Sequence, residues 1–324
     1  MSPSLLRRLF LLTAALLAGA CVCAQTYPSR PIKLVVPFPP GGSTDILARL
    51  LSQSLGDKLK QPIVVDNKPG ASTILGAESV AKASPDGYTL LLSAAGTYTV
   101  NPAVYKKLPY DPLASFDPLG IVGSTSLVLL ANPAIKANSL KELVEEVRKI
   151  PGGASYGSFG TASTSHFAGE MITAATHMNL LHVPYKGSAP AMQDLMGNQI
   201  SLSIDTVVAA APQLKAGKVK AIAITGTVRS NLLPQVPTAA EAGYPAVSLS
   251  TWFAIVGPKG LPAAVRSTLE AAVAATMKEK ALQDALIKSG YEPEYGTPDD
   301  YRARVPREIA RLRTIAEAAK ITAE

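Results

Sequence analysis

The stretch that decides the fold reads Val35-Val36-Pro37-Phe38-Pro39-Pro40-Gly41-Gly42-Ser43-Thr44-Asp45. Its first two residues end an apolar run, 32–36, that is typical of a buried strand. A leucine-rich helical pattern over 46–55 comes directly after it. We expect Ser43 or Thr44 to cap this helix. A glycine-rich turn before a helix N-terminus presents free backbone N–H groups, and together with the helix dipole these attract an anion. No lysine or arginine lies between residues 35 and 48, so neutral donors should hold such an anion.

The first hundred residues alternate strand, loop and helix. After the helix predicted over 44–58, a strand is predicted over 63–65, a helix over 71–83 and a strand over 88–92. Continuous apolar strands that alternate with amphipathic helices predict a parallel sheet covered on both faces. Loops of small residues follow two of the strands, at 67–73 and at 93–97. Ligands bind at such carboxyl ends of strands in open α/β sheets.

Two stretches are unusually long for single strands, 119–132 and 248–258. The first is interrupted by the small residues 123–126. We interpret both stretches as connections between two α/β lobes, with hinges near 123–126 and 247–251 and a ligand cleft between the lobes. The predicted division is 25–124 with 248–324 for lobe 1, and 125–247 for lobe 2.

A second informative loop lies in lobe 2. The strand predicted over 154–158 runs into a loop rich in glycine, serine and threonine, 159–165, and a helix begins near His166. This repeats the arrangement of the first loop, and we expect the two loops to face each other across the cleft. Further lobe 2 strands are predicted over 181–187, 200–205 and 219–225. The tail from 262 onward is helical, and Pro306 should break or kink its last helix.

The N-terminus has the pattern of a secretory signal peptide, 1–24. Arg7 and Arg8 precede the apolar run 9–20, and small residues before Gln25 suit cleavage there. A lipoprotein anchored at Cys21 is the alternative. With cleavage before Gln25, the only two cysteines leave with the signal, which excludes disulfides and cysteine-based sites from the mature protein. No later segment is long enough to insert in a membrane.

Charge and motif patterns exclude several function classes. Without Arg7 and Arg8, 29 of the 31 basic residues remain against 24 acidic residues, a net charge of about +5. The basic residues are scattered, so nucleic-acid binding is not expected. The three histidines have no metal-ligand spacing with carboxylates. Neither the G-x-G-x-x-G fingerprint nor a P-loop is present, so we expect no metal and no cofactor.

Several segments together resemble the periplasmic solute-binding receptors of tripartite tricarboxylate transporters, also called Bug receptors. They are 27–32, 36–45, 85–90, 156–158 with 166–170, 182–187 and 236–243. The resemblance covers nearly all of 27–316. It implies a type II periplasmic-binding-protein fold with two α/β lobes, no catalysis and no cofactor. It also implies a monomeric periplasmic receptor that binds a small carboxylate (a di- or tricarboxylate, an amino acid or an aromatic acid) and passes it to membrane transporter subunits.

The resemblance also implies which loop positions hold one ligand carboxylate through amides, hydroxyls and waters. These are Gly41, Gly42 and Asp45 in one loop and Ser158, Gly160, Thr161 and Ser163 in the facing loop. Positions at strand ends and helix starts add Phe38, Ser93, His166, Tyr185 and Asp205 to the candidate ligand-binding residues. Many relatives carry Gly-Ala-Gly-Gly where this chain has Gly70-Ala71-Ser72-Thr73, and the two added side chains should narrow that wall.

Other roles stay open for several of these residues. Asp45 either orients its loop or meets an ammonium group, His166 is either structural or a ligand contact, and Asp205 either caps the following segment or binds a ligand. Trp252 is interpreted as a packing residue. A secreted hydrolase that uses Ser158 or Ser163 with His166 and Asp205 is the alternative enzyme hypothesis, although no G-x-S-x-G elbow is present. A subunit that presents a ligand to a membrane sensor is a further alternative.

Overall fold

The structure is a computed structural model and describes residues 27–319 and 321. The predicted signal peptide 1–24, with Cys21 and the expected cleavage before Gln25, lies outside the described residues. Within the described part of the chain, no helix has the length and apolar character needed to cross a membrane.

Lobe 1 is built on the parallel sheet expected for the first hundred residues. Its strands are β1 (Ile32–Val36), β2 (Ile63–Asn67) and β3 (Thr89–Ala94), with β1 between the other two. Leu34 and Leu90 pack toward α2 (Ser43–Leu59) and α9 (Ala263–Met277), whereas Val35 and Leu91 point to the opposite face. Because both faces are covered, β1 and β3 contain continuous apolar runs, 34–36 and 90–92, rather than an alternating pattern. The helices of the opposite face are α3 (Ile74–Ala81) and α11 (Pro298–Ala319).

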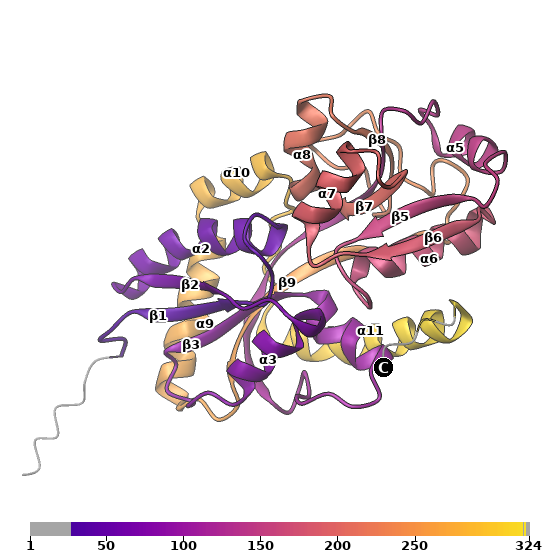
Figure 1. Ribbon diagram of the computed structural model, residues 1–324. Coiled ribbons are helices and arrows are strands. Elements are labelled where there is room, and N and C mark those ends of the chain that lie inside the picture. The colour runs from indigo at the N-terminus through magenta and orange to yellow at the C-terminus, as the bar shows by residue number, and fades with distance from the viewer. Residues whose placement is uncertain (1–26, 320, 322–324) are drawn as a thin grey trace, which may run out of the picture.

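Lobe 2 repeats this plan with different strands. Its strands are β5 (Ala154–Ser158), β6 (Leu180–Pro184), β7 (Leu202–Thr206) and β8 (Lys220–Ile224), and β5 pairs in parallel with both β6 and β7. Its helices are α5 (Leu140–Val147), α6 (Thr164–Thr176), α7 (Ser188–Met196) and α8 (Val207–Lys215). Two lobes of this kind, joined at the centre, are visible in Figure 1.

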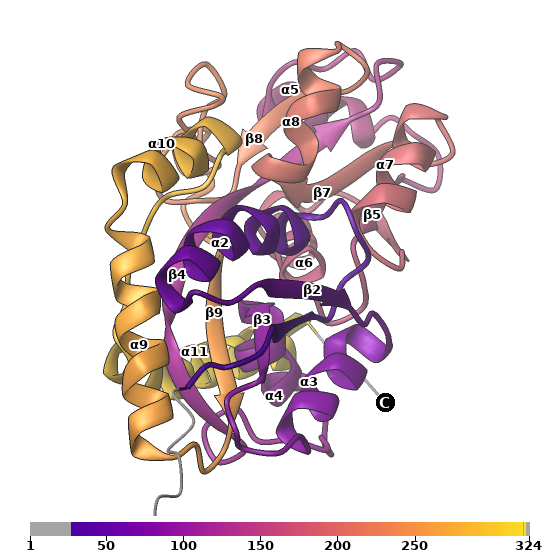
Figure 2. The same ribbon diagram turned by 90° about the vertical axis from the view of Figure 1, so that its left-hand side faces the viewer.

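Two long antiparallel strands join the lobes. β4 (Phe116–Ala131) pairs with β9 (Ser250–Pro258) over 116–126, with β7 over 127–131 and with β8 over 128–131. The two ribbons run side by side in Figure 2. β4 is therefore one continuous strand that enters both sheets. A shift in its register with β9 between Ile121 and Ser124 accommodates the change of direction from one sheet to the other. The chain positions at which one lobe ends and the other begins, 124/125 and 247/248, stay a prediction.

The C-terminal helix makes a further contact between the lobes. α11 follows α10 (Lys280–Ser289), and its residues Leu312 and Ala316 pack in one buried cluster with Ala162 and Phe167 of lobe 2. Of the two outcomes expected at Pro306, the break is wrong, because α11 continues through this residue, and the kink stays a prediction. Tyr301 and Val305 are buried in the lobe 1 core on one side of Pro306, and the contact with lobe 2 holds the other side.

Two local expectations near the cleft are also wrong. Neither Ser43 nor Thr44 caps α2, because the helix begins at Ser43 with Gly42 as its N-cap residue and without a side-chain cap. The helix expected over 71–83 begins only at Ile74, after a 3₁₀ turn, η1 (Ala71–Thr73), whose three residues have φ of 44°, 51° and 77°. Such backbone angles are rare for residues other than glycine, so contacts made elsewhere must hold this turn.

Candidate ligand-binding cleft

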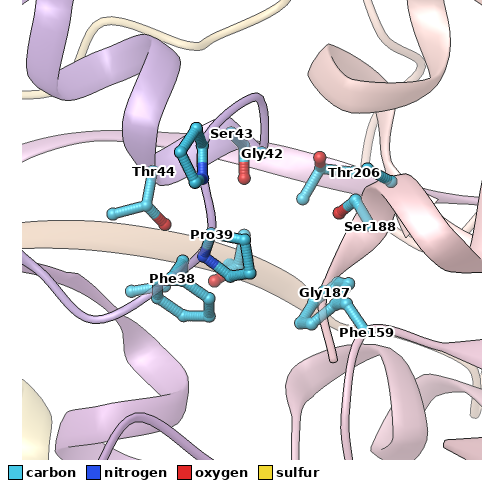
Figure 3. Close-up of a pocket in the computed structure, with 13 residues that line it drawn as sticks. Phe38, Pro39, Gly42, Ser43, Thr44, Phe159, Gly187, Ser188 and Thr206 are labelled. Carbon is cyan, nitrogen blue, oxygen red and sulfur yellow. The ribbon is translucent and has the colours of Figure 1, made fainter. Parts of the chain in front are cut away.

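A small cavity lies between the lobes at the N-terminus of α2. This α2 cavity has a volume of ≈ 30 Å³. Its lining residues are Phe38, Pro39, Pro40, Gly42, Ser43, Thr44, Ala94 and Thr251 on one side and Phe159, Gly187, Ser188, Ala189 and Thr206 on the other. Figure 3 shows the first loop facing Phe159, Gly187, Ser188 and Thr206 across the cavity. A space of this volume holds about one or two water molecules, so the lobes are close together here.

A second cavity of ≈ 30 Å³ lies next to it, at the N-terminus of α6. This α6 cavity is lined by Phe38, Ser72, Thr73, Ala94, Gly96 and Asn101 of lobe 1 and by the loop residues 159–164 of lobe 2. Phe38, Ala94 and Phe159 line both cavities. The two cavities are therefore neighbouring parts of one cleft, and the two phenylalanines stand between them.

Four helix N-termini converge on this cleft. The N-cap residues are Gly42 for α2, Gly187 for α7 and Thr206 for α8 at the α2 cavity, and Ser163 for α6 at the α6 cavity. First-turn N–H groups have no partner within their own helix, and the helix dipole adds positive potential at this end. No lining residue of either cavity carries a charge. The cleft is thus suited to an anion held by neutral donors, and binding of an anion here stays a prediction.

Asp45 holds the first loop in shape. Its carboxylate accepts hydrogen bonds from the Gly41 N–H (3.0 Å), the Arg49 guanidinium (3.0 Å) and the Asn67 amide (3.1 Å), and the residue is 3% exposed. Burial by itself would raise the pKa of Asp45, but these hydrogen bonds outweigh it and lower the pKa below its usual range. Asp45 lines neither cavity. Of its two alternatives, the structure therefore favours the one in which Asp45 orients the loop.

The facing loop is held by its own hydroxyls. Ser163 Oγ accepts from the His166 N–H at 3.3 Å and donates to the Gly160 carbonyl, and the Phe159 N–H donates to Ser165. Gly160, Thr161 and Ser163 line the α6 cavity, as Phe38 does, and Gly42 lines the α2 cavity. Ser158 is fully buried behind the loop.

His166 and His182 form a stacked pair behind this loop. Their ring centroids are 3.8 Å apart with the planes 9° from parallel. His182 Nε2 lies 2.7 Å from Ser158 Oγ, and His166 Nδ1 accepts from the Ala162 N–H at 3.2 Å. The pair thus supports the loop, and neither histidine lines either cavity. His182 was not among the predicted residues, because only the pairing of β5 with β6 brings it to the loop.

The pH dependence of stability is expected to reflect the protonation of these two histidine rings. Burial, and for His166 also the neighbouring His182, lowers the pKa to about 3 for His166, and burial lowers it to about 4 for His182. The unfolded chain, with a pKa of 6.5, then binds more protons than the folded chain between pH 6.5 and 4, so stability falls as the pH falls through this window. Each histidine contributes up to about 1.4 kcal/mol per pH unit.

Asp205 opposes this trend, because burial raises its pKa to about 6. Its folded form binds an extra proton between pH 6 and 4, which offsets one of the two histidines. Urea unfolding at intervals from pH 7 to 4 should therefore show a free energy of unfolding that falls with pH at the rate expected for one histidine, up to about 1.4 kcal/mol per pH unit. His182→Gln should flatten the slope and Asp205→Asn should steepen it; equal slopes in all three proteins would contradict the assignment.

The remaining predicted residues lie around the cleft without lining it. Asp205 is 1% exposed and accepts from Ser188 Oγ (2.9 Å) and from the Thr206 N–H (2.7 Å), and both partners line the α2 cavity. Tyr185 donates to Asp194 at 2.6 Å. Ser93 belongs to a buried hydroxyl chain through Thr97 to Thr73. Gly41, with φ of +85°, shapes the first loop.

The hydrolase triad is not assembled. Asp205 is bonded to Ser188 and Thr206, whereas His166 accepts from a backbone N–H. The close serine–histidine contact is that of Ser158 with His182, and this serine is fully buried.

One hydrogen bond joins the two walls of the α6 cavity. Ser72 Oγ donates to the Thr161 carbonyl at 2.9 Å, and Thr73 accepts from Asn101 at 3.2 Å. These contacts hold η1 in its positive-φ conformation. Glycine adopts such angles readily, which explains the glycines that the resemblance places at 72 and 73 in many relatives. Here two hydroxyl side chains occupy that wall instead.

Comparison with known proteins places the chain in a family. A sequence model described as the tripartite tricarboxylate transporter family receptor matches residues 47–321. The chain belongs to this family. The protein BugT of Bordetella pertussis is 38% identical over 304 residues, which cover 94% of this chain and 93% of BugT. The resemblance to Bug receptors is therefore confirmed, and the family is one of solute-binding receptors.

Solved structures of this receptor family confirm the predicted fold class. The periplasmic binding protein BugD has a TM-score of 0.87 and 36% identity, with 92% of this chain and 100% of BugD covered. The R. palustris protein Rpa4515, determined with adipate, has a TM-score of 0.88 and 35% identity, with 91% of this chain and 99% of that protein covered.

Proposed function

We propose that this receptor captures a small carboxylate between its lobes in the periplasm and delivers it to the membrane subunits of a tripartite tricarboxylate-type transporter. The observation that carries the proposal is the cleft itself, in which helix N-termini from both lobes converge on cavities lined without charged side chains. A carboxylate suits such donors, because it accepts several short, charge-assisted hydrogen bonds. The adipate named for the R. palustris relative supports the same ligand class.

The arrangement of the cleft also supports closure around the ligand. Both cavities are lined from two lobes, and each is too small for an acid of several carbon atoms at its present volume. Ligand entry therefore requires the lobes to move apart about β4 and β9, and binding would be completed by their return. The predicted signal peptide supports the periplasmic location, and we propose that the receptor acts as a monomer.

Carboxylate binding is testable by calorimetric titration of residues 25–324 with succinate, malate, citrate, adipate, glutamate and benzoate. At least one acid should bind, and the neutral diamide of a bound diacid should bind about 10-fold or more weakly, because the amide loses the charge-assisted hydrogen bonds. No heat of binding with any acid would contradict the proposal. Delivery is tested separately, by uptake of the bound acid into cells that carry the transporter's membrane subunits with and without this receptor.

A further inference from the structure

One buried hydroxyl group stands apart from all the others. Among the described residues, Thr251 Oγ1 is the single buried side-chain nitrogen or oxygen atom that has no hydrogen-bond partner. The residue is 1% exposed. Buried hydroxyl groups are almost always hydrogen-bonded, because an unpaired one loses its contacts with water and gains nothing in return. The position of Thr251 therefore requires an explanation.

Thr251 lies where the two lobes meet. It belongs to β9 and lines the α2 cavity together with Gly42 and Ser43 of lobe 1 and Thr206 of lobe 2. Its partner across the sheet, Thr125 of β4, is buried to the same degree. The Thr125 hydroxyl, however, donates to the Gly290 carbonyl at 2.9 Å. The unpaired state is therefore a property of the cavity position, not of threonine in this pair of strands.

The two lobe 2 hydroxyl groups at this cavity, those of Ser188 and Thr206, already donate hydrogen bonds within the protein. Ser188 donates to Asp205 at 2.9 Å, and Thr206 lies 3.4 Å from the same carboxylate while it accepts from the Ala209 N–H. A hydroxyl whose proton goes to a buried carboxylate can offer an anion only its lone pairs, which repel it. The proton of Thr251 has no acceptor in the protein and is available.

We propose that Thr251 is a ligand-binding residue that donates its hydroxyl proton to a carboxylate oxygen in the α2 cavity. The inference rests on the proposed function and adds a contact from the connecting strand to those of the helix N-termini at this cavity. The N-termini of α2 in lobe 1 and of α7 and α8 in lobe 2 would hold the carboxylate from either side, and Thr251 would hold it from β9, the strand about which the lobes move. Its unpaired hydroxyl destabilises the ligand-free protein and is satisfied when the acid binds.

The test compares three variants in two measurements. Calorimetry with the six acids above gives the affinity, and thermal unfolding without any acid gives the stability. Thr251→Val keeps the shape of the side chain but loses the hydroxyl, so it should weaken binding of the acids that wild type binds by about 10-fold or more. The same variant should unfold at an equal or higher temperature than wild type, because an unpaired polar group has been removed. Thr251→Ser keeps the donor and should retain most of the affinity.

Thr125→Val is the matched control. It removes a hydroxyl that has a partner, so it should lower the unfolding temperature and change the affinity by no more than about twofold. An unchanged affinity in Thr251→Val would overturn the inference, as would an equal loss of affinity in Thr125→Val, which would indicate packing of the hinge strands. If wild type binds none of the six acids, the proposed function fails and this inference fails with it.

Discussion

A disulfide between residues 39 and 187 is expected to abolish carboxylate binding until it is reduced. Pro39 lies in the first loop of lobe 1, and Gly187 caps α7 in lobe 2. A Cβ atom at Gly187 would lie 3.8 Å from Pro39 Cβ, about the mean separation in a disulfide. The bond would keep the lobes closed over cavities of ≈ 30 Å³. With the open state below about 1% of molecules, the apparent affinity falls by about 100-fold or more.

The measurement is a titration of Pro39→Cys/Gly187→Cys with a bound acid, before and after dithiothreitol. The reduced protein is the matched control, because it carries the same strain from placing a side chain at φ of +113°. Within residues 25–324 the engineered cysteines are the only two, so no other disulfide can form within the chain. Equal affinity of the oxidised and reduced forms would show that the acid reaches its site without separation of the lobes.

Trp252→Ala is expected to be the most destabilising single substitution near the hinge, with a loss of roughly 3–5 kcal/mol. Trp252 is the only tryptophan and is 1% exposed. It stacks on Tyr98 with ring centroids 5.8 Å apart, packs edge-to-face with Tyr301 and donates from Nε1 to Glu308 at 2.7 Å. These contacts attach α11 to β9. Their removal leaves a large cavity and an unpaired glutamate oxygen in lobe 1.

Circular dichroism on heating provides the measurement, and the unfolding temperature should fall by roughly 5–8 °C for a chain of this size. Trp252→Phe is the control, because it keeps an aromatic ring on Tyr98 and loses only the indole N–H and part of the volume. This control should lower the free energy of unfolding by only about 1–2 kcal/mol. A loss below about 1 kcal/mol in Trp252→Ala would contradict the packing role.

Much of lobe 1 could be predicted because its signals are local. The apolar run of β1, the small residues after it and the leucine repeat of α2 each identify their element from neighbouring residues alone. The same holds for β5, the loop 159–163 and α6. Where local signals failed, distant contacts decided the outcome. η1 takes positive φ because Ser72 bonds to Thr161, which is 89 residues away.

The roles of the site residues could be predicted only in part. Both loops were placed from their position between a strand and a helix N-terminus. Ser188 and Thr206, however, reach the cleft only through the order in which strands pair in lobe 2, and that order depends on long-range packing. The choice between two roles for Asp45 needed the positions of Arg49 and Asn67.

The sequence by itself indicated the class of structure and the kind of group that the cleft is suited to bind. A glycine-rich turn before a helix N-terminus is a local property that already indicates an anion, and the absence of lysine and arginine from the first loop indicates that neutral donors would hold it. Only the tertiary structure decided which hydroxyls have a free proton. Thr125 and Thr251 are the same residue type on paired strands, yet one bonds to Gly290 and the other faces the cavity. Whether a hydroxyl group donates a hydrogen bond within the protein depends on residues that are far away in the sequence, and these residues come together only in the folded chain.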